Sequence, residues 1–146
     1  MEIRVVAGDI TEQSVEAIVV NLFEGVTNPG GATGAVDRAL GGAISRLIED
    51  GETKGKKGEM MLIHTLGTMA PSRVVVAGLG KKSEFDEDTV RVVSAVACRF
   101  LRRSGVQSIA TIAHATGIGG MDAKASGRGI AEGSVLGLYR FDKYKT

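Results

Sequence analysis

The sequence contains few of the residues that mark several large classes of protein. A single cysteine, Cys98, among 146 residues excludes an internal disulfide framework and fits a reducing compartment. Aromatic residues make up only 4% of the chain, so it lacks the usual platform for stacking the bases of single-stranded nucleic acid. The formal net charge of +1 is not the basic excess of a general nucleic-acid-binding protein. With no signal-peptide pattern and no apolar run long enough to cross a membrane, the expected location is the cytoplasm.

The chain also lacks a recognisable set of catalytic or metal-binding residues. His64 and His114 each end an apolar stretch, and neither has a carboxylate or cysteine at metal-ligand spacing. Cys98 lies among apolar neighbours without an activating base, which favours a buried structural thiol. Lysines 54, 56, 57, 81 and 82 are expected to form a solvated surface, the alternative being a basic rim beside an anionic ligand. The sequence therefore predicts binding or assembly rather than catalysis, with no metal ion in this chain.

Strand and helix signals alternate along a length that suits one domain, residues 1–146. Apolar and β-branched runs predict strands at residues 3–7, 17–22, 60–65, 73–77 and 108–113. Helical spacing predicts helices at residues 34–50, 86–103 and 122–138, with a solvated connector at 52–58. Gly41 and Gly42, inside the first helix, are expected to permit close packing there. This order predicts a three-layer α/β/α fold with a mixed, largely parallel sheet.

Two glycine-rich loops, each between a predicted strand and a predicted helix, are the main functional signal. Glycine permits positive φ and close approach of a ligand to the backbone, and a helix start offers N–H donors and partial positive charge to phosphate. Two such loops would hold a pyrophosphate between them. The candidate residues are Gly30, Gly31, Thr33 and Gly34 in the first loop, and Thr116, Gly117, Ile118, Gly119 and Gly120 in the second.

Each of these motifs also has an ordinary structural interpretation. The first glycine loop serves equally as a tight connection between a strand and a helix. In the second, glycine suits a tight turn as well as a phosphate. Asp9, which follows a strand and precedes Thr11, is typical of a turn or a cap.

Several segments resemble the N-terminal domain of leucyl aminopeptidases. They are residues 21–25 (Asn-Leu-Phe-Glu-Gly), 54–59 (Lys-Gly-Lys-Lys-Gly-Glu), 74–81 and, most specifically, the ending Tyr-Arg-Phe-Asp-Lys-Tyr-Lys at 139–145. In that family the ending leads into a separate catalytic domain with two divalent metal ions, so residues 139–146 resemble the start of a linker. The family's metal ligands have no counterpart here. The resemblance thus implies a non-catalytic domain, for assembly or regulation, whose partner is an aminopeptidase catalytic domain.

More distantly, the chain resembles the macro domain, an ADP-ribose-binding fold. Gly8-Asp9-Ile10-Thr11 is similar to the motif whose aspartate holds the adenine amino group. Residues 30–36 and 115–120 are similar to the two phosphate loops. Macro hydrolases carry paired asparagines after the second strand, whereas Asn21 is followed here by Leu22 and Phe23. The resemblance therefore implies binding of ADP-ribose or a related nucleotide through Asp9, Ile10 and the two loops, rather than its turnover.

Three hypotheses follow from these observations. The first is a domain of the leucyl aminopeptidase N-terminal type, whose parent protein, if the chain continues, is a two-metal aminopeptidase. The second is a free-standing macro-like module that binds a nucleotide. The third is a structural subunit that associates with another chain or with itself through an aromatic tail formed by Tyr139, Phe141 and Tyr144.

Overall fold

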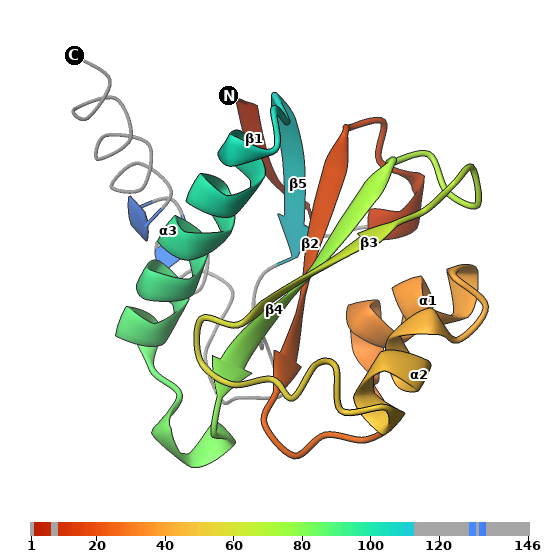
Figure 1. The fold of residues 1–146 in the computed structure, drawn as a ribbon. Helices are drawn as coiled ribbons and strands as arrows, with labels where there is room; N and C mark the ends of the chain where they lie inside the picture. Colours follow the sequence, from red (N-terminus) through yellow and green to blue (C-terminus); the bar gives the residue numbers. More distant parts are fainter. Residues whose placement is uncertain (1, 7–8, 113–128, 131, 134–146) are drawn as a thin grey trace.

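The computed structural model describes residues 2–6, 9–112, 129–130 and 132–133 (Figure 1). Within them the strands are β1 (Glu2–Val6), β2 (Ala17–Phe23), β3 (Met60–His64), β4 (Arg73–Gly80) and β5 (Ser108–Ile112). The α-helices are α1 (Gly31–Ala39), α2 (Ala43–Glu49) and α3 (Glu87–Arg103), and two short 3-10 turns are η1 (Ile10–Glu12) and η2 (Lys82–Glu84). Each of the five predicted strands is present, with ends that differ by one to three residues.

The strands form one sheet in the order β1-β5-β2-β4-β3. The pairings of β1 with β5, β5 with β2 and β2 with β4 are parallel, and only β3 runs antiparallel to its neighbour β4. In the centre, Ala17 of β2 is aligned with Ile109 of β5 on one side and Arg73 of β4 on the other. The mixed, largely parallel sheet predicted from the sequence is confirmed.

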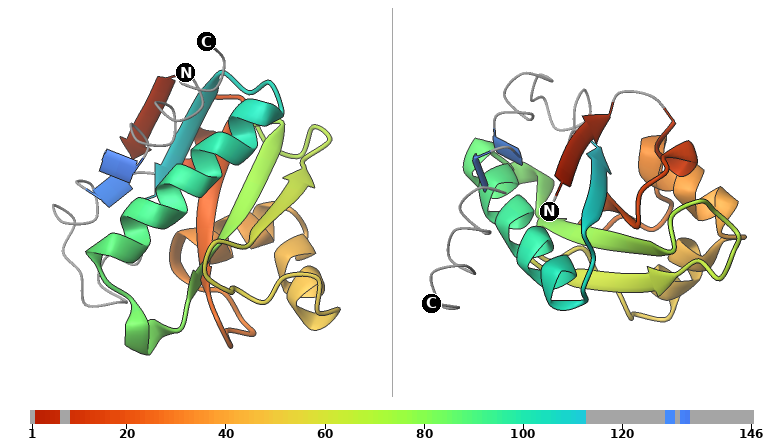
Figure 2. Two further views of the ribbon diagram at one scale, coloured as in Figure 1. Left: turned by 60° about the vertical axis from the view of Figure 1, so that its left-hand side comes forward. Right: turned by 90° about the horizontal axis from the view of Figure 1, so that it is seen from above.

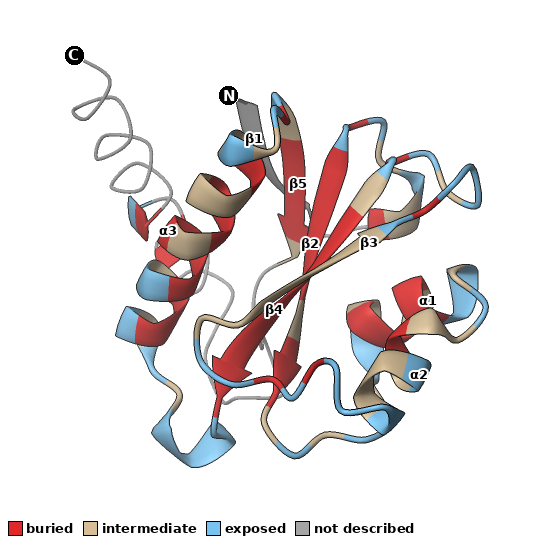
Figure 3. Ribbon diagram, in the orientation of Figure 1, coloured by how far each residue is buried: buried red, intermediate tan, exposed pale blue. Residues whose placement is uncertain are grey.

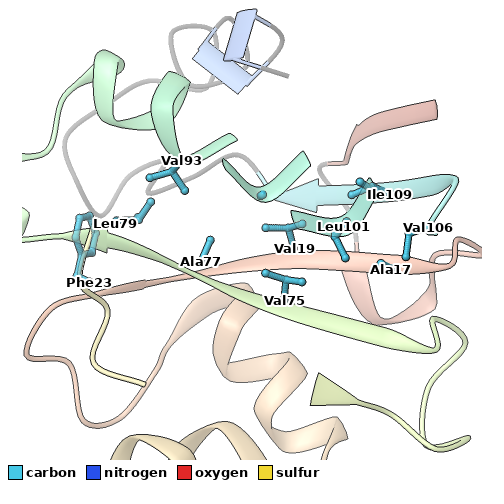
Figure 4. Close-up of a cluster of buried hydrophobic side chains, with 11 residues drawn as sticks. Ala17, Val19, Phe23, Val75, Ala77, Leu79, Val93, Leu101, Val106 and Ile109 are labelled. Carbon is cyan, nitrogen blue, oxygen red and sulfur yellow. The ribbon is translucent and has the colours of Figure 1, made fainter. Parts of the chain in front are cut away.

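Helices cover both faces of this sheet, which gives the predicted three layers (Figure 2). Because successive side chains of a strand point to opposite faces, β2 supplies both cores. Val19 faces α3 and packs in a cluster with Val93 and Leu101 (Figure 4). Ile18 and Val20 face the other way, into a cluster that includes Val36 of α1 and Ile44 of α2. The almost complete burial of β2 and β4 explains their unbroken apolar sequences (Figure 3).

The third helix begins and ends where its sequence predicts. The carboxylate of Asp86 accepts hydrogen bonds from the Thr89 N–H (2.8 Å) and hydroxyl (2.9 Å), which caps the amino end. At the carboxyl end Gly105 has φ of 80°, a conformation that suits glycine. Cys98 on this helix is buried, as expected. Of the predicted helix at 122–138, only 129–130 and 132–133 lie among the described residues, and Glu132 there pairs with Arg91 (3.0 Å).

The single helix predicted at residues 34–50 is wrong, because the structure divides it into α1 and α2. Gly41 and Gly42 have φ of 67° and 87°, values that a right-handed helix cannot contain. The expected close packing at these glycines is also wrong, since a Cβ built on either would meet no atom within 4 Å. The two glycines are therefore needed for their backbone conformation, which turns the chain between the helices.

The solvated connector predicted at residues 52–58 is only partly correct. Its three lysines are exposed, but Thr53 is 1% exposed and Gly55 is buried. The segment from 53 to 59 follows the end of β4 through backbone hydrogen bonds, from the Gly78 N–H to the Glu59 carbonyl (2.8 Å) and from the Gly80 N–H to the Gly55 carbonyl (2.8 Å). We call residues 53–59 the edge loop. It covers the carboxyl ends of β2 and β4.

The substitution Gly78→Ala tests how closely the edge loop is packed. A Cβ at this position would overlap the carbonyl oxygen of Lys56, a backbone atom that cannot move without shifting the loop. We expect a loss of about 3 kcal/mol in the free energy of unfolding, at the upper end of overpacking costs, measured from urea denaturation. Gly30→Ala is the control, because a Cβ there meets open space; it should cost less than about 1 kcal/mol. Equal losses in the two variants would contradict this packing.

Candidate functional site at the carboxyl-terminal edge of the sheet

The carboxyl ends of the parallel strands meet at one edge of the sheet, and the predicted ligand residues follow these strands. The connection after β2 enters α1 on one face, whereas the connection after β4 enters α3 on the other (Figure 1). In open α/β sheets, ligands bind at the carboxyl edge where neighbouring connections leave in opposite directions. That position lies between β2 and β4, and here the edge loop fills it: a Cβ on Gly55 would lie 2.6 Å from the Phe23 carbonyl oxygen.

The first glycine loop lies at the same edge, at the amino end of α1. Gly30 is the N-cap and makes no side-chain capping bond, while Gly31 begins the helix with φ of 56°. That φ accounts for the glycine at position 31. A helix leaves its first N–H groups without partners inside the helix, so the amides that open α1 are the donors this loop offers to an anion.

Two other predicted residues of this loop have clear packing roles. The Thr33 hydroxyl donates to the Asn21 carbonyl oxygen (2.8 Å), and this side chain is only 4% exposed. It therefore fastens the first turn of α1 to β2. Gly34 donates its N–H to the Gly30 carbonyl (3.0 Å), and a Cβ on it would lie 2.6 Å from the Pro29 carbonyl oxygen. Contact of these two residues with a ligand stays a prediction. Because the Thr33 hydroxyl is buried and bonded to Asn21, a ligand would contact the backbone of Thr33.

Asp9 is the N-cap of η1, and Ile10 is the first residue of this turn. η1 contacts both α1 and β5. The structure thus places the Asp9 turn beside the helix that follows the first loop and the strand that precedes the second. The Asp9 carboxylate accepts from the Thr11 hydroxyl (2.6 Å) and N–H (2.9 Å), and these bonds lower the pKa of Asp9. Ile10 is 1% exposed and packs with Val36. Asp9 therefore has the ordinary capping role, and the Ile10 side chain belongs to the core.

The second glycine loop cannot be located in the same way. Thr116, Gly117, Ile118, Gly119 and Gly120 lie outside the described residues, as do His114 and the ending from 139 to 145. The last described residue before this loop is Ile112, which is aligned with Val6 at the carboxyl end of β1. Whether the two loops form one site stays a prediction.

The structure also shows a role for Glu59 that sequence reasoning missed. One carboxylate oxygen, Oε1, accepts three hydrogen bonds within the edge loop, from the Lys54 N–H (2.7 Å), the Gly55 N–H (3.0 Å) and the Thr53 hydroxyl (3.2 Å). Partial burial disfavours the charged form, but these bonds and the charge of Lys56 outweigh it and lower the pKa of Glu59. No spacing rule would reveal this contact, because the loop must first close on itself.

Within the described parts of the chain, no group of three or more His, Cys, Asp and Glu residues could hold a metal ion. His64 is exposed at the end of β3. The same residues include no helix that is both long and apolar enough to cross a membrane. Among the described residues at this edge, the polar groups are backbone amides, the capped turn at Asp9 and the exposed lysines of the edge loop.

The Glu59 contact gives the stability of the protein a dependence on pH. Because the folded pKa lies below the ordinary one, the unfolded chain binds more protons in acid. The stabilisation is present above the ordinary carboxylate pKa and is lost as the pH falls through the lowered value. Glu59→Gln should therefore lower the urea midpoint at pH 7 and approach the wild-type midpoint near pH 3. Glu52→Gln, at an exposed residue just before the edge loop, is the control. A deficit for Glu59→Gln that is equal at both pH values would contradict the role of the charge.

Comparison with known proteins gives the sequence family. A family model described as the N-terminal domain of the cytosol aminopeptidase family matches residues 19–146. A probable cytosol aminopeptidase from Alkaliphilus metalliredigens is 35% identical over 146 residues, which is the whole of this chain. The chain spans only 29% of that relative, so it corresponds to less than a third of the longer protein.

Comparison with solved structures identifies the fold. The macrodomain of Mycobacterium tuberculosis DarG matches with a TM-score of 0.72 and 20% identity, covering 90% of this chain and 88% of that one. An Oceanobacillus iheyensis macrodomain solved with ADP matches with a TM-score of 0.71 and 16% identity, covering 92% and 75%. The fold expected from the macro-domain resemblance is thus confirmed. The chain belongs to the cytosol aminopeptidase family and is an N-terminal domain of that family with a macrodomain-like fold.

Proposed function

We propose that this domain serves the assembly or regulation of a cytoplasmic two-metal aminopeptidase and carries none of its chemistry. The observation that supports this most strongly is the family match over residues 19–146, with relatives more than three times as long. In such proteins the remaining part of the chain is the natural partner of this domain. The domain would contribute a rigid docking surface, with hydrolysis left to the metal-binding part.

The experiment joins this chain to the C-terminal part of the Alkaliphilus relative, from the end of the matched region. We expect the chain alone to show no metal-dependent cleavage of leucine p-nitroanilide. The fused protein should be active. The number of subunits per particle by light scattering, or the kcat, should differ from that of the C-terminal part alone, because the domain would set the assembly. An identical number of subunits, kcat and KM with and without the domain would refute the proposal.

A second function, nucleotide binding, is supported by the fold and by the first glycine loop. Macrodomains with the same fold include one solved with ADP. The amino end of α1 has no side-chain cap, Gly30 and Gly31 there are exposed, and a helix start of this kind suits an anion. We propose that ADP-ribose or a related nucleotide would place its pyrophosphate here, with Asp9 at the base. Lys54, Lys56 and Lys57 are exposed on the edge loop at the same edge of the sheet.

Titration calorimetry with ADP-ribose and with ADP tests this second function. We expect a micromolar Kd that weakens at least tenfold in Asp9→Ala. Asp86→Ala is the matched control, because Asp86 caps a helix through the same pair of bonds, and that helix packs on the opposite face of the sheet from Ile10 of η1. That variant should bind as the wild type does. No heat at millimolar ligand, or equal weakening in both variants, would exclude this site.

A further inference from the structure

The turn between β3 and β4 contains a residue in a conformation that its side chain disfavours. Leu66 has φ of 53° and Gly67 has φ of 88°, and the Thr68 N–H donates to the Thr65 carbonyl (3.1 Å). Two central residues with positive φ and this hydrogen bond make a type I′ turn. Such turns favour asparagine, aspartate or glycine at both central positions, because a larger side chain clashes with the backbone there. Glycine meets this demand at position 67, but leucine does not at position 66.

The same leucine gains nothing from burial. Its side chain is 90% exposed, the larger of the two values found for exposed large hydrophobic residues in the described chain. One position therefore combines an unfavourable backbone conformation with an apolar side chain in water. A single exposed leucine is unremarkable, but its presence in the left-handed region requires an explanation.

The turn is nevertheless held firmly by bonds that do not involve the leucine side chain. Thr65 is buried, and its hydroxyl donates to the Pro71 carbonyl (2.7 Å) while its N–H donates to the Ser72 carbonyl (3.0 Å). The Thr68 hydroxyl donates to the Thr65 carbonyl (2.7 Å). These bonds fix the backbone whatever side chain is present at position 66. The exposed side chain of Leu66 therefore extends from a backbone that is held in a fixed position.

The strand that leads into this turn is apolar, and no strand of the described chain pairs with its outer edge. β3 is the last strand of the sheet, and Met61, Leu62 and Ile63 pack against the two cores but are only partly buried (Figure 3). It contains no lysine, glutamate or proline of the kind that protects natural edge strands from pairing. Leu66 therefore stands at the end of a strand edge that can accept a further segment.

We propose that Leu66 and the outer edge of β3 form the surface on which the C-terminal part of a full-length family member docks. This inference rests on the proposed assembly function. The relatives supply the occupant, because more than two-thirds of their length lies outside the region that this chain matches. A hydrophobic pocket in that part would bury the Leu66 side chain and compensate the strained turn.

Variants at position 66 are tested both in this chain and in its fusion to the C-terminal part of the Alkaliphilus relative. In the chain alone, Leu66→Asn should raise the Tm by about 2–4 °C, because asparagine suits the turn. Leu66→Ala keeps the backbone conflict and should leave the Tm nearly unchanged. In the fusion, both variants should lower the Tm of the first unfolding transition. Leu66→Asn should therefore raise the Tm of the chain alone but lower that of the fusion. Val92→Ala is the control: it removes a second exposed apolar group, on α3, and should change the Tm by the same amount in the chain alone and in the fusion.

Two results would overturn the inference. The first is a rise in Tm for Leu66→Asn in the fusion as well as in the chain alone. The second is a dimer of the chain alone that dissociates in Leu66→Asn on light scattering, which would assign the surface to a second copy. Either result leaves the proposed function standing if the fusion still differs in subunit number or kcat from the C-terminal part alone.

Discussion

The parallel pairing of β2 with β4 on one side and β5 on the other is the contact on which the rest of the structure depends. Through this pairing β2 buries side chains alternately in two cores, with α3 on one face and α1 and α2 on the other. The same pairing brings the carboxyl ends of three strands to one edge. Every candidate ligand residue that the structure describes follows a strand of this sheet, so its position is set by strand register.

The edge loop is the second constraint at that edge. It covers the ends of β2 and β4, where sheets of this kind usually bind ligands, with backbone packed directly on backbone at Gly55 and Gly78. Glu59 holds the loop in shape by accepting three hydrogen bonds. η1 lies at this edge in contact with both β5 and α1.

Glycine illustrates how much of the fold and the site could be predicted from the sequence. The glycine loop before α1 was identified from its position between an apolar strand and an amphipathic helix, which is local information. The break at Gly41–Gly42 was missed. A glycine pair within a helical pattern is compatible with a continuous helix of lower stability and also with a left-handed turn that ends the helix. Gly78 resembles other glycines in sequence, yet it is required by the carbonyl group of Lys56, from a different part of the chain. Thr33 likewise became a bridge to Asn21 only after α1 had packed on β2.

The sequence by itself determined the strands, the long third helix, the mixed three-layer sheet and the family, because these depend on periodicity, capping residues and motifs within short segments. The tertiary structure alone decided that the edge loop seals the ends of β2 and β4, that Ile10 belongs to the core, and that Leu66 is displayed in a strained turn. These features arise from contacts between residues that are distant in sequence, or from a backbone conformation imposed by such contacts. No local pattern encodes them.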